Sequence, residues 1–198
     1  SHEERRPAVA EYTAIDIAIA CIEKYNLHGK ICHASTIEGI QKIKDAKARG
    51  VDITVEVTPH HLYFDETMFD ADLRKKLQVN PPIRQTKENR LALIEALRDG
   101  TIDYLATDHA PHTLEEKEKG MSGMPHLDTY GPFTSWLMKE HNFTAQDIAR
   151  VCSYNPGKFI NEFQDERYGE VKEGFVGSLT IRSMEGSNPI LRSHLKTK

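Results

Sequence analysis

The sequence predicts an α/β fold built from parallel βαβ units, and three observations support this prediction. Short apolar segments alternate along the chain with longer segments whose apolar residues recur at helical spacing. The short segments are apolar over most of their length, as expected for parallel strands that are covered on both faces. Glycines break the chain between these segments, at Gly29, Gly50 and Gly100.

The first half of the chain supplies two of the predicted strands. Residues 8–27 carry an apolar stripe at helical spacing, and Pro7 stands where the first turn of a helix tolerates proline. A short, largely apolar strand is predicted over residues 30–34. A helix over residues 37–49 and a second strand over residues 51–57, where apolar residues alternate, follow it.

The third strand lies further along the chain. An irregular stretch is expected up to residue 86, followed by a helix over residues 87–98 and a strand over residues 102–106. The loop predicted over residues 107–128 is too long for a plain connector, and such loops are usually functional. Three more helices are predicted, over residues 132–140, 144–151 and 156–161.

A change of composition at residue 169 predicts a domain boundary. Residues 1–168 are assigned to the α/β domain. Residues 169–198 are assigned to the start of a small β-rich domain, with a strand over residues 178–181.

Composition and charge narrow the class of protein. The formal net charge of −4 argues against nucleic acid or an anionic membrane as the main partner. No apolar run approaches the roughly 20 residues of a membrane span, and the first residues do not read as a signal peptide. Three scattered cysteines are typical of reduced thiols. We therefore expect a cytoplasmic protein.

Polar side chains gather where the predicted strands end. In α/β barrels the catalytic groups collect at the carboxyl ends of strands. His33 ends the first predicted strand, His60 and His61 follow the second, and Asp108 and His109 follow the third. Histidine and carboxylate are the usual ligands of a catalytic zinc ion, so these positions are candidate metal ligands.

Each candidate also has a plain structural interpretation. In the functional interpretation, Asp108 is a metal ligand or general base, and His112 contacts the substrate. In the structural interpretation, Asp108 caps a loop and the neighbouring histidines are exposed to solvent. A histidine that ends a strand, such as His33, is often only hydrogen-bonded. Adjacent residues of an extended chain point opposite ways, so at most one of His60 and His61 is expected to face a given site.

Two further segments carry polar residues of interest. Residues 80–84 are stiff because of two prolines, and they could present Asn80 as an amide donor and acceptor or Arg84 as a carboxylate clamp. The alternative is a rigid loop without a site role. The charge run over residues 115–119 mixes both signs and is interpreted as a solvated face.

Four segments together resemble the dihydroorotases of the amidohydrolase superfamily. The most specific is residues 106–117, which read ATDHAPHTLEEK. Residues 31–36 (ICHAST), 56–62 (EVTPHHL) and 79–84 (VNPPIR) match the same family in the same order. The resemblance extends from about residue 5 to about residue 181.

The resemblance implies a distorted (β/α)8 barrel of the TIM type with one or two Zn²⁺ ions and a small β-domain. This chain would supply about the last three βα units, in residues 1–168, and the start of the C-terminal part of the β-domain, in residues 169–198. His33 and Asp108 would be metal ligands, and Asp108 would also move the proton. The residues that would hold the substrate are Asn80 and His112, with backbone groups near Pro125 and His126.

The activity implied is the reversible, metal-dependent interconversion of dihydroorotate and N-carbamoyl-aspartate in pyrimidine biosynthesis. The family's His-x-His metal ligands do not occur in these 198 residues, so the remaining ligands are expected upstream. The chain is therefore expected to be the C-terminal half of such an enzyme, inactive alone.

Two alternatives to this function remain open at the level of sequence. One is a related cyclic-amide hydrolase such as a hydantoinase or allantoinase. The other is a non-catalytic dihydroorotase-like subunit that scaffolds aspartate transcarbamoylase. A small-molecule substrate is expected, with association into a homo-oligomer or with aspartate transcarbamoylase, and with no nucleic-acid or membrane partner.

Overall fold

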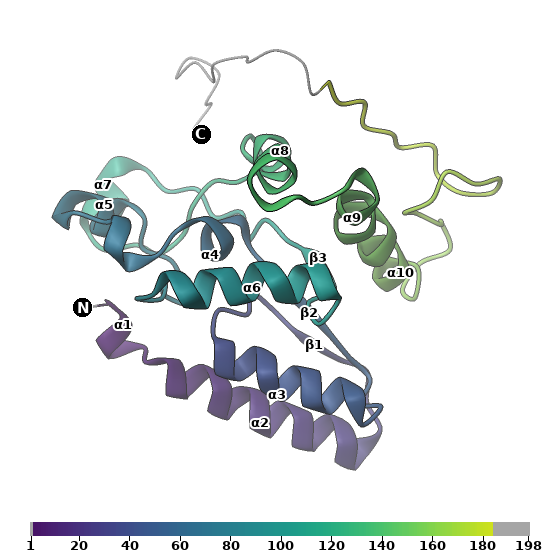
Figure 1. The fold of residues 1–198 in the computed structure, drawn as a ribbon, viewed down its shortest axis with the longest axis horizontal. Coiled ribbons are helices and arrows are strands. Elements are labelled where there is room, and N and C mark those ends of the chain that lie inside the picture. Colours follow the sequence, from purple (N-terminus) through teal and green to yellow (C-terminus); the bar gives the residue numbers. More distant parts are fainter. Residues whose placement is uncertain (1, 184–198) are drawn as a thin grey trace. The chain divides into compact units, whose positions relative to one another are not determined.

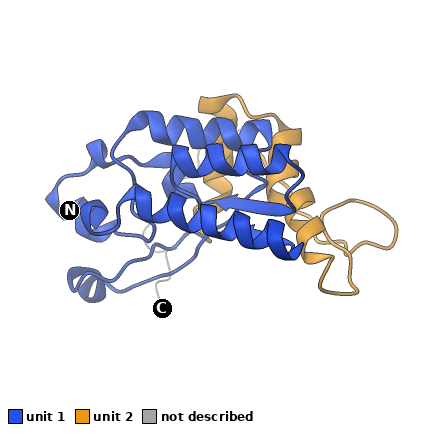
Figure 2. Ribbon diagram, turned by 90° about the horizontal axis from the view of Figure 1, so that it is seen from below, with its two compact units in different colours: residues 1–126 blue, residues 127–198 orange. Residues whose placement is uncertain are grey.

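The computed structural model describes residues 2–183 of the 198-residue chain. The chain divides into two compact units, residues 1–126 and residues 127–198 (Figure 2). The boundary predicted at residue 169 lies within the second unit and stays a prediction. The part of the predicted β-rich domain over residues 184–198 lies outside the described residues.

Unit 1 contains a parallel sheet of three strands in the order β1 (Gly29–Ile31), β2 (Ile53–Val57) and β3 (Tyr104–Leu105). Gly29 pairs with Ile53 at one side of β2, and Val57 pairs with Leu105 at the other. Each crossover between the strands contains a helix (Figure 1). The predicted parallel βαβ arrangement is therefore confirmed.

Three long helices flank this sheet in unit 1, namely α2 (Ala8–Tyr25), α3 (Ile37–Ala48) and α6 (Lys87–Asp99). α3 packs against α2 on one side and α6 on the other (Figure 1). Thr36 begins α3 by accepting a hydrogen bond from the Gly39 N–H. Asn26 ends α2 in the left-handed conformation.

The core of unit 1 lies between the sheet and these helices. Val55 and Val57 of β2 are fully buried, as are Ile43 of α3 and Leu93 and Leu97 of α6. This burial of apolar side chains from the central strand and from both crossover helices supplies the main stabilisation of the unit.

Two of the strands are shorter than predicted, for local reasons. β1 ends at Ile31 because His33 has a φ of 41°, which no strand residue adopts. β3 begins only at Tyr104 because the Asp103 carboxylate, rather than a backbone carbonyl, accepts the Val55 N–H at 2.7 Å. The strand ends that carry the candidate site are thus irregular.

The segments predicted as irregular contain short helices. α4 (Pro59–Tyr63), the 3₁₀ turn η1 (Glu66–Met68) and α5 (Ala71–Lys76) lie between β2 and α6, and α7 (Leu114–Glu118) lies in the long loop. Asp70 caps α5, and Thr113 and Glu116 form a capping box at α7. Polar caps therefore stabilise helices too short to show an apolar period.

A separate apolar cluster holds these loop segments together. Phe69, Val79, Ile83 and Met124 are buried against one another, with Phe64 and Leu77 packed on them. The cluster joins the segment before α6 to the far end of the long loop. It supports the backbone next to Asn80 and His126.

Unit 2 is helical in the described residues, with α8 (Tyr130–His141), α9 (Ala145–Ala149), the π-helical segment η2 (Arg150–Tyr154) and α10 (Asn155–Ile160). Gly157 of α10 lies so close to Gly169 that an added Cβ would fall 2.5 Å from the Tyr168 carbonyl oxygen. The strand predicted over residues 178–181 is not formed, because no neighbouring strand of the described residues pairs with it.

Among the α-helices of the described residues, α1 (His2–Arg5) is the shortest and α2 is the longest. None is long and apolar enough to cross a bilayer.

Candidate active site

His33 and Asp108 stand out by their backbone conformation. In residues 2–183, four residues other than glycine have a positive φ, and two of these, Asn26 and Asn142, end helices. The other two are His33, with φ of 41°, and Asp108, with φ of 44°. Each follows a strand of the parallel sheet, β1 or β3. Backbone strain at non-capping positions is concentrated at functional sites, so both are candidates for function.

The imidazole of His33 has a free nitrogen. Its Nδ1 is buried and has no hydrogen-bond partner among the described residues. A buried polar atom without a partner is costly unless it receives a ligand. The described residues hold no group of three or more His, Cys, Asp or Glu side chains that could bind a metal ion. His33 and Asp108 would thus supply only part of a metal site.

His60 and His61 lie in α4, not in an extended segment, so the expectation that they point opposite ways is wrong. Their ring centroids are 4.4 Å apart, and both side chains are buried. His60 Nδ1 lies 2.8 Å from His126 Nε2, whereas His61 Nε2 lies 3.0 Å from the Pro81 carbonyl oxygen. The two rings therefore reach two different loops that carry predicted site residues.

Three histidines form a chain across unit 1. The His126 N–H donates to His109 Nδ1 at 3.0 Å, and the rings of His126 and His60 stack with centroids 5.0 Å apart. The outer nitrogen of His60, Nε2, is buried without a partner in the described part of the chain. Burial, with the charge of His109, lowers the pKa of His126 to about 4.

The same factors keep His60 and His61 neutral. Burial lowers the pKa of His60 well below its ordinary value, and the neighbouring histidines His61, His126 and His33 lower it further. Burial also lowers the pKa of His61 to about 4. The influence of His33 on both places it within electrostatic range of these two rings.

Asn80 is exposed next to this histidine pair. Its Oδ1 lies 3.0 Å from Nε2 of His2, and the same nitrogen lies 2.9 Å from the Val79 carbonyl oxygen. Asn80 is joined to Pro81 by a cis peptide bond. The structure thus places the predicted amide group on a proline-rich turn that His61 contacts.

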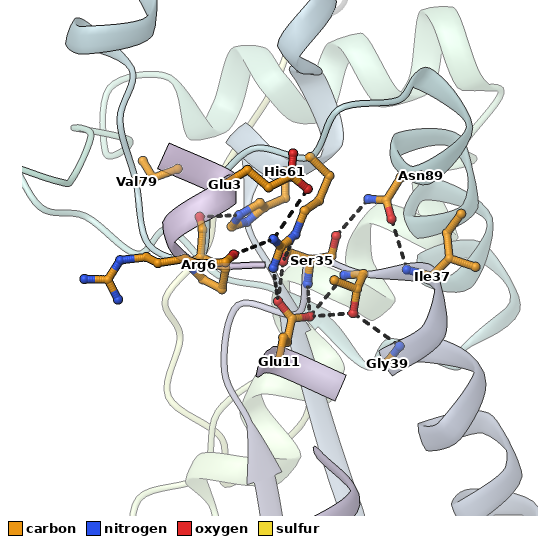
Figure 3. Close-up of polar contacts among 12 residues, drawn as sticks. Glu3, Arg6, Glu11, Ser35, Ile37, Gly39, His61, Val79 and Asn89 are labelled. Atoms are coloured by element: carbon orange, nitrogen blue, oxygen red, sulfur yellow. Dashed lines mark hydrogen bonds and ion pairs between the residues drawn. The ribbon is translucent and has the colours of Figure 1, made fainter. Parts of the chain in front are cut away.

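Arg84 does not face solvent, which contradicts its interpretation as a substrate clamp. Its side chain is 6% exposed. Nη2 donates to Glu11 at 2.9 Å, Nε donates to Ser35 Oγ at 3.0 Å, and Nη1 donates to the Arg6 carbonyl oxygen at 3.1 Å (Figure 3). All three nitrogens are therefore engaged inside the protein.

Glu11 is the acceptor at the centre of this cluster (Figure 3). Oε1 accepts the N–H groups of Ser35 at 2.9 Å and Thr36 at 3.0 Å, and Ser35 Oγ donates to Oε2. Burial alone would raise the pKa of Glu11, but the hydrogen bonds from Ser35 and the charge of Arg84 outweigh it and lower the pKa. The carboxylate fixes the backbone immediately after His33.

The long loop brings the remaining predicted residues together. Nε2 of His112 donates to the Ser122 carbonyl oxygen at 3.1 Å. Gly123 has a φ of 142°, and an added Cβ would fall 2.6 Å from the Ala110 carbonyl oxygen. The segment that leads to Pro125 and His126 is therefore packed against the segment that follows Asp108.

Lys117 corrects the interpretation of residues 115–119 as a solvated face. It is buried, and its ammonium group donates to the carbonyl oxygens of Gln78 at 2.9 Å, Met121 at 2.9 Å and Gly123 at 2.8 Å. Burial lowers its pKa. Lys117 thus fastens the loop to the residues just before Asn80.

The sequence analysis did not predict an ion pair between Lys30 and Glu56, which lies close to Cys32. The Lys30 ammonium group pairs with Glu56 at 2.8 Å, beside Cys32. Burial raises the pKa of Cys32, and the negative charges of Glu56 and Asp108 raise it further. Alternation along β1 and β2 could have placed these residues on one face, but not paired them.

The arrangement can support acid–base chemistry beside a metal ion. Asp108 offers a carboxylate on a strained turn, and His33 offers a free buried nitrogen. By contrast, the cavity of about 430 Å³ in unit 2 is lined by Tyr130, Thr134 and Cys152 among others, and it contains none of the predicted site residues.

Comparison with known proteins gives close relatives by sequence. No family model matches the chain. It is 39% identical over 198 aligned positions to the dihydroorotase of Halalkalibacterium halodurans, covering 97% of this chain and 45% of that protein. The dihydroorotases of Geobacillus thermodenitrificans and Listeria monocytogenes are 36% and 35% identical, over 93% and 90% of this chain. The chain thus spans less than half the length of these relatives.

Solved structures give the fold. The L-hydantoinase (dihydropyrimidinase) of Arthrobacter aurescens matches with a TM-score of 0.77 and 25% identity, over 85% of this chain and 38% of that one. The D-hydantoinase of a Thermus species matches with a TM-score of 0.74 and 25% identity, over 80% and 36%. The predicted fold class, α/β with part of a TIM-type barrel, is confirmed by this likeness.

Proposed function

Because nearly the whole chain is related in sequence to dihydroorotases, we propose that the protein interconverts dihydroorotate and N-carbamoyl-aspartate in pyrimidine biosynthesis. The observation that carries the proposal is the positive φ that His33 and Asp108 share, each in the segment that follows a strand of the parallel sheet, β1 or β3. Chemistry at the carboxyl ends of parallel strands is the rule in α/β barrels.

His33 and Asp108 are proposed to hold one or two Zn²⁺ ions together with ligands beyond these two. The free, buried Nδ1 of His33 and the half-buried carboxylate of Asp108 fit such a group. When bound, the ion supplies a polarised ring carbonyl and an acidified water molecule.

The chain's own residues have separate roles in this proposal. Asp108 is the catalytic residue that takes a proton on its carboxylate and returns it to the departing amide nitrogen. Asn80 and His112 hold the substrate through hydrogen bonds, aided by backbone groups at Pro125 and His126. The side chain of Asn80 is exposed and that of His112 half-buried, so both are accessible to a small molecule.

The assignment of residues 1–168 to the barrel and residues 169–198 to the start of the small β-domain remains part of the proposal. So do a cytoplasmic location, the absence of nucleic-acid and membrane partners, and association into a homo-oligomer or with aspartate transcarbamoylase. The net charge of −4 supports the expectation that nucleic acid is not a partner.

Sequence identity favours dihydroorotate over the substrates of other cyclic-amide hydrolases. The dihydroorotases are 34–39% identical to this chain, whereas the hydantoinases with solved structures are 23–25% identical. A purely scaffolding subunit has no physical need for a strained His33 and Asp108, so the catalytic proposal is preferred.

The proposal is tested with the full-length enzyme that contains this chain, loaded with Zn²⁺ and supplied with dihydroorotate, hydantoin or allantoin. We expect turnover of dihydroorotate, at least about 1,000-fold slower in Asp108→Ala, because both a ligand and a general base are lost. Asp52→Asn, a change at an exposed carboxylate, is the control. Full activity of Asp108→Ala rejects the mechanism, and turnover of hydantoin alone rejects the substrate.

A further inference from the structure

His61 is a buried residue to which the proposed mechanism gives no role. Its side chain lies beside the Glu11–Arg84 cluster in Figure 3, at the end of β2. Nδ1 lies 2.8 Å from Thr58 Oγ1, and Nε2 lies 3.0 Å from the Pro81 carbonyl oxygen. Both ring nitrogens are therefore paired, unlike those of its neighbour His60.

The two contacts determine which nitrogen of His61 carries the proton. A carbonyl oxygen only accepts, so the Nε2–H must donate to Pro81. Burial lowers the pKa of His61 to about 4, which leaves Nδ1 bare at neutral pH. Nδ1 then accepts from the Thr58 hydroxyl, which has an O–H group to donate.

The turn that His61 contacts is poor in hydrogen-bond donors of its own. Pro81 and Pro82 have no backbone N–H, so neither can hold the turn by donating to the rest of the protein. Side chains from outside the turn instead donate to its carbonyl groups, as His2 does to Val79 and His61 does to Pro81. His61 is the side chain that reaches the carbonyl of Pro81, the residue directly after Asn80.

We propose that His61 is a positioning residue, which holds the Pro81 carbonyl and so fixes the orientation in which the Asn80 amide meets the substrate. This inference rests on the proposed function, because it concerns the substrate contact of Asn80. Thr58 donates to Nδ1, so the proton of the His61 ring lies on Nε2. His61 in turn donates to the Pro81 carbonyl and holds the turn in place. Neither side chain touches the reacting atoms in this scheme.

The test uses the full-length, Zn²⁺-loaded enzyme that contains this chain and two substitutions of similar size. In His61→Gln the side-chain amide can still donate to Pro81, whereas in His61→Met no donor remains. We expect His61→Met to raise KM for dihydroorotate roughly tenfold, as for one lost hydrogen bond, with kcat changed less than about threefold. His61→Gln is expected to restore KM to within about threefold of the original protein.

A double-mutant cycle shows whether His61 acts through Asn80. In an Asn80→Ala background, His61→Met is expected to raise KM no further, because the amide that it positions is absent. Independent effects of the two substitutions on KM overturn the inference. Equal KM values for His61→Met and His61→Gln also overturn it, since a merely structural role does not depend on the donor.

A measurement without substrate separates this inference from the proposed function. The ¹⁵N chemical shifts of His61 at pH 7 are expected to report the Nε2–H tautomer, and an Nδ1–H or charged ring overturns the inference whatever the substrate is. If the protein turns over hydantoin rather than dihydroorotate, the proposed function fails, and the KM comparisons are made with hydantoin. If no cyclic amide is turned over, both fail.

Discussion

The guanidinium group of Arg84 and the carboxylate of Glu11 meet at 2.9 Å although 73 residues separate them in the chain. Their side chains are 6% and 13% exposed. A second carboxylate, Glu3, lies 3.7 Å from the guanidinium. The pair connects α2 to the turn after Asn80 and, through Ser35, to the backbone after His33.

Removing the charge of Glu11 is expected to destabilise the protein strongly. Glu11→Gln leaves Arg84 buried with only the more distant Glu3, and breaking a buried pair costs about 3–5 kcal/mol. Glu23→Gln is the matched control, because Glu23 pairs with Arg49 at 2.8 Å on the surface, where a pair contributes about 0–1 kcal/mol. Urea unfolding measures both, and similar losses would contradict the central place of Glu11.

Lys117→Met is expected to loosen the long loop. The substitution keeps most of the side-chain volume but removes the donor of the Met121 and Gly123 carbonyl oxygens and one of two donors to Gln78, a loss of about 1–3 kcal/mol. Lys119→Met, two residues on and exposed, is the control and should change stability by less than about 0.5 kcal/mol. Amide hydrogen exchange over residues 120–126 should accelerate only in Lys117→Met, and protection equal to the control would refute this role.

The positive φ of His33 predicts a separation of stability from function. His33→Gly removes the strain of a left-handed residue, so the metal-free protein should unfold at the same or a higher denaturant concentration. Ala34→Gly, at a buried neighbour without positive φ, should cost about 1 kcal/mol. The zinc content of His33→Gly should fall with its activity. A loss of stability in His33→Gly that matches Ala34→Gly would argue against strain.

Stability should fall on mild acidification because of the buried histidines. The folded pKa of His126 is about 4, below its ordinary 6.5, so the unfolded chain binds more protons between these values. Stability from this group is complete above pH 6.5 and is lost as the pH falls towards 4. The free energy of unfolding should drop by roughly 2 kcal/mol per such histidine from pH 7 to pH 5. His126→Gln should flatten this slope, whereas His28→Gln, at a histidine with a partly exposed ion pair, should not.

The strand-end residues could be predicted from the sequence because they depend on local patterns. The apolar period marks each strand, and His33 and Asp108 lie in the short segments that follow β1 and β3. The boundaries were less accurate where tertiary contacts replace ladder bonds, as when Asp103 accepts the Val55 N–H. Short helices such as α7 were missed because capping, not an apolar period, stabilises them.

The pairings across loops could not be predicted, because they depend on how distant segments pack. His60 contacts His126, which lies 66 positions further along the chain. No local pattern in either segment predicts this contact. Lys117 was assigned to the surface because a mixed charge run is usually solvated, yet the carbonyl groups that bind it belong to the folded loop. For Arg84 the sequence left a carboxylate clamp and a rigid loop open, because its carboxylate partners lie far away in the chain, in α1 and α2.

The apolar cluster of Phe69, Val79, Ile83 and Met124 has a consequence for the order of folding. It gathers segments far apart in the chain and without long helices, so its closure costs more chain entropy than the pairing of neighbouring βα units. We expect the helices around β2 to acquire hydrogen-exchange protection first in a refolding experiment, and the amides of residues 120–126 last. Loop protection as early as that of α6 would refute this order. The binding loops would then be the last part of the chain to mature, on a scaffold already in place.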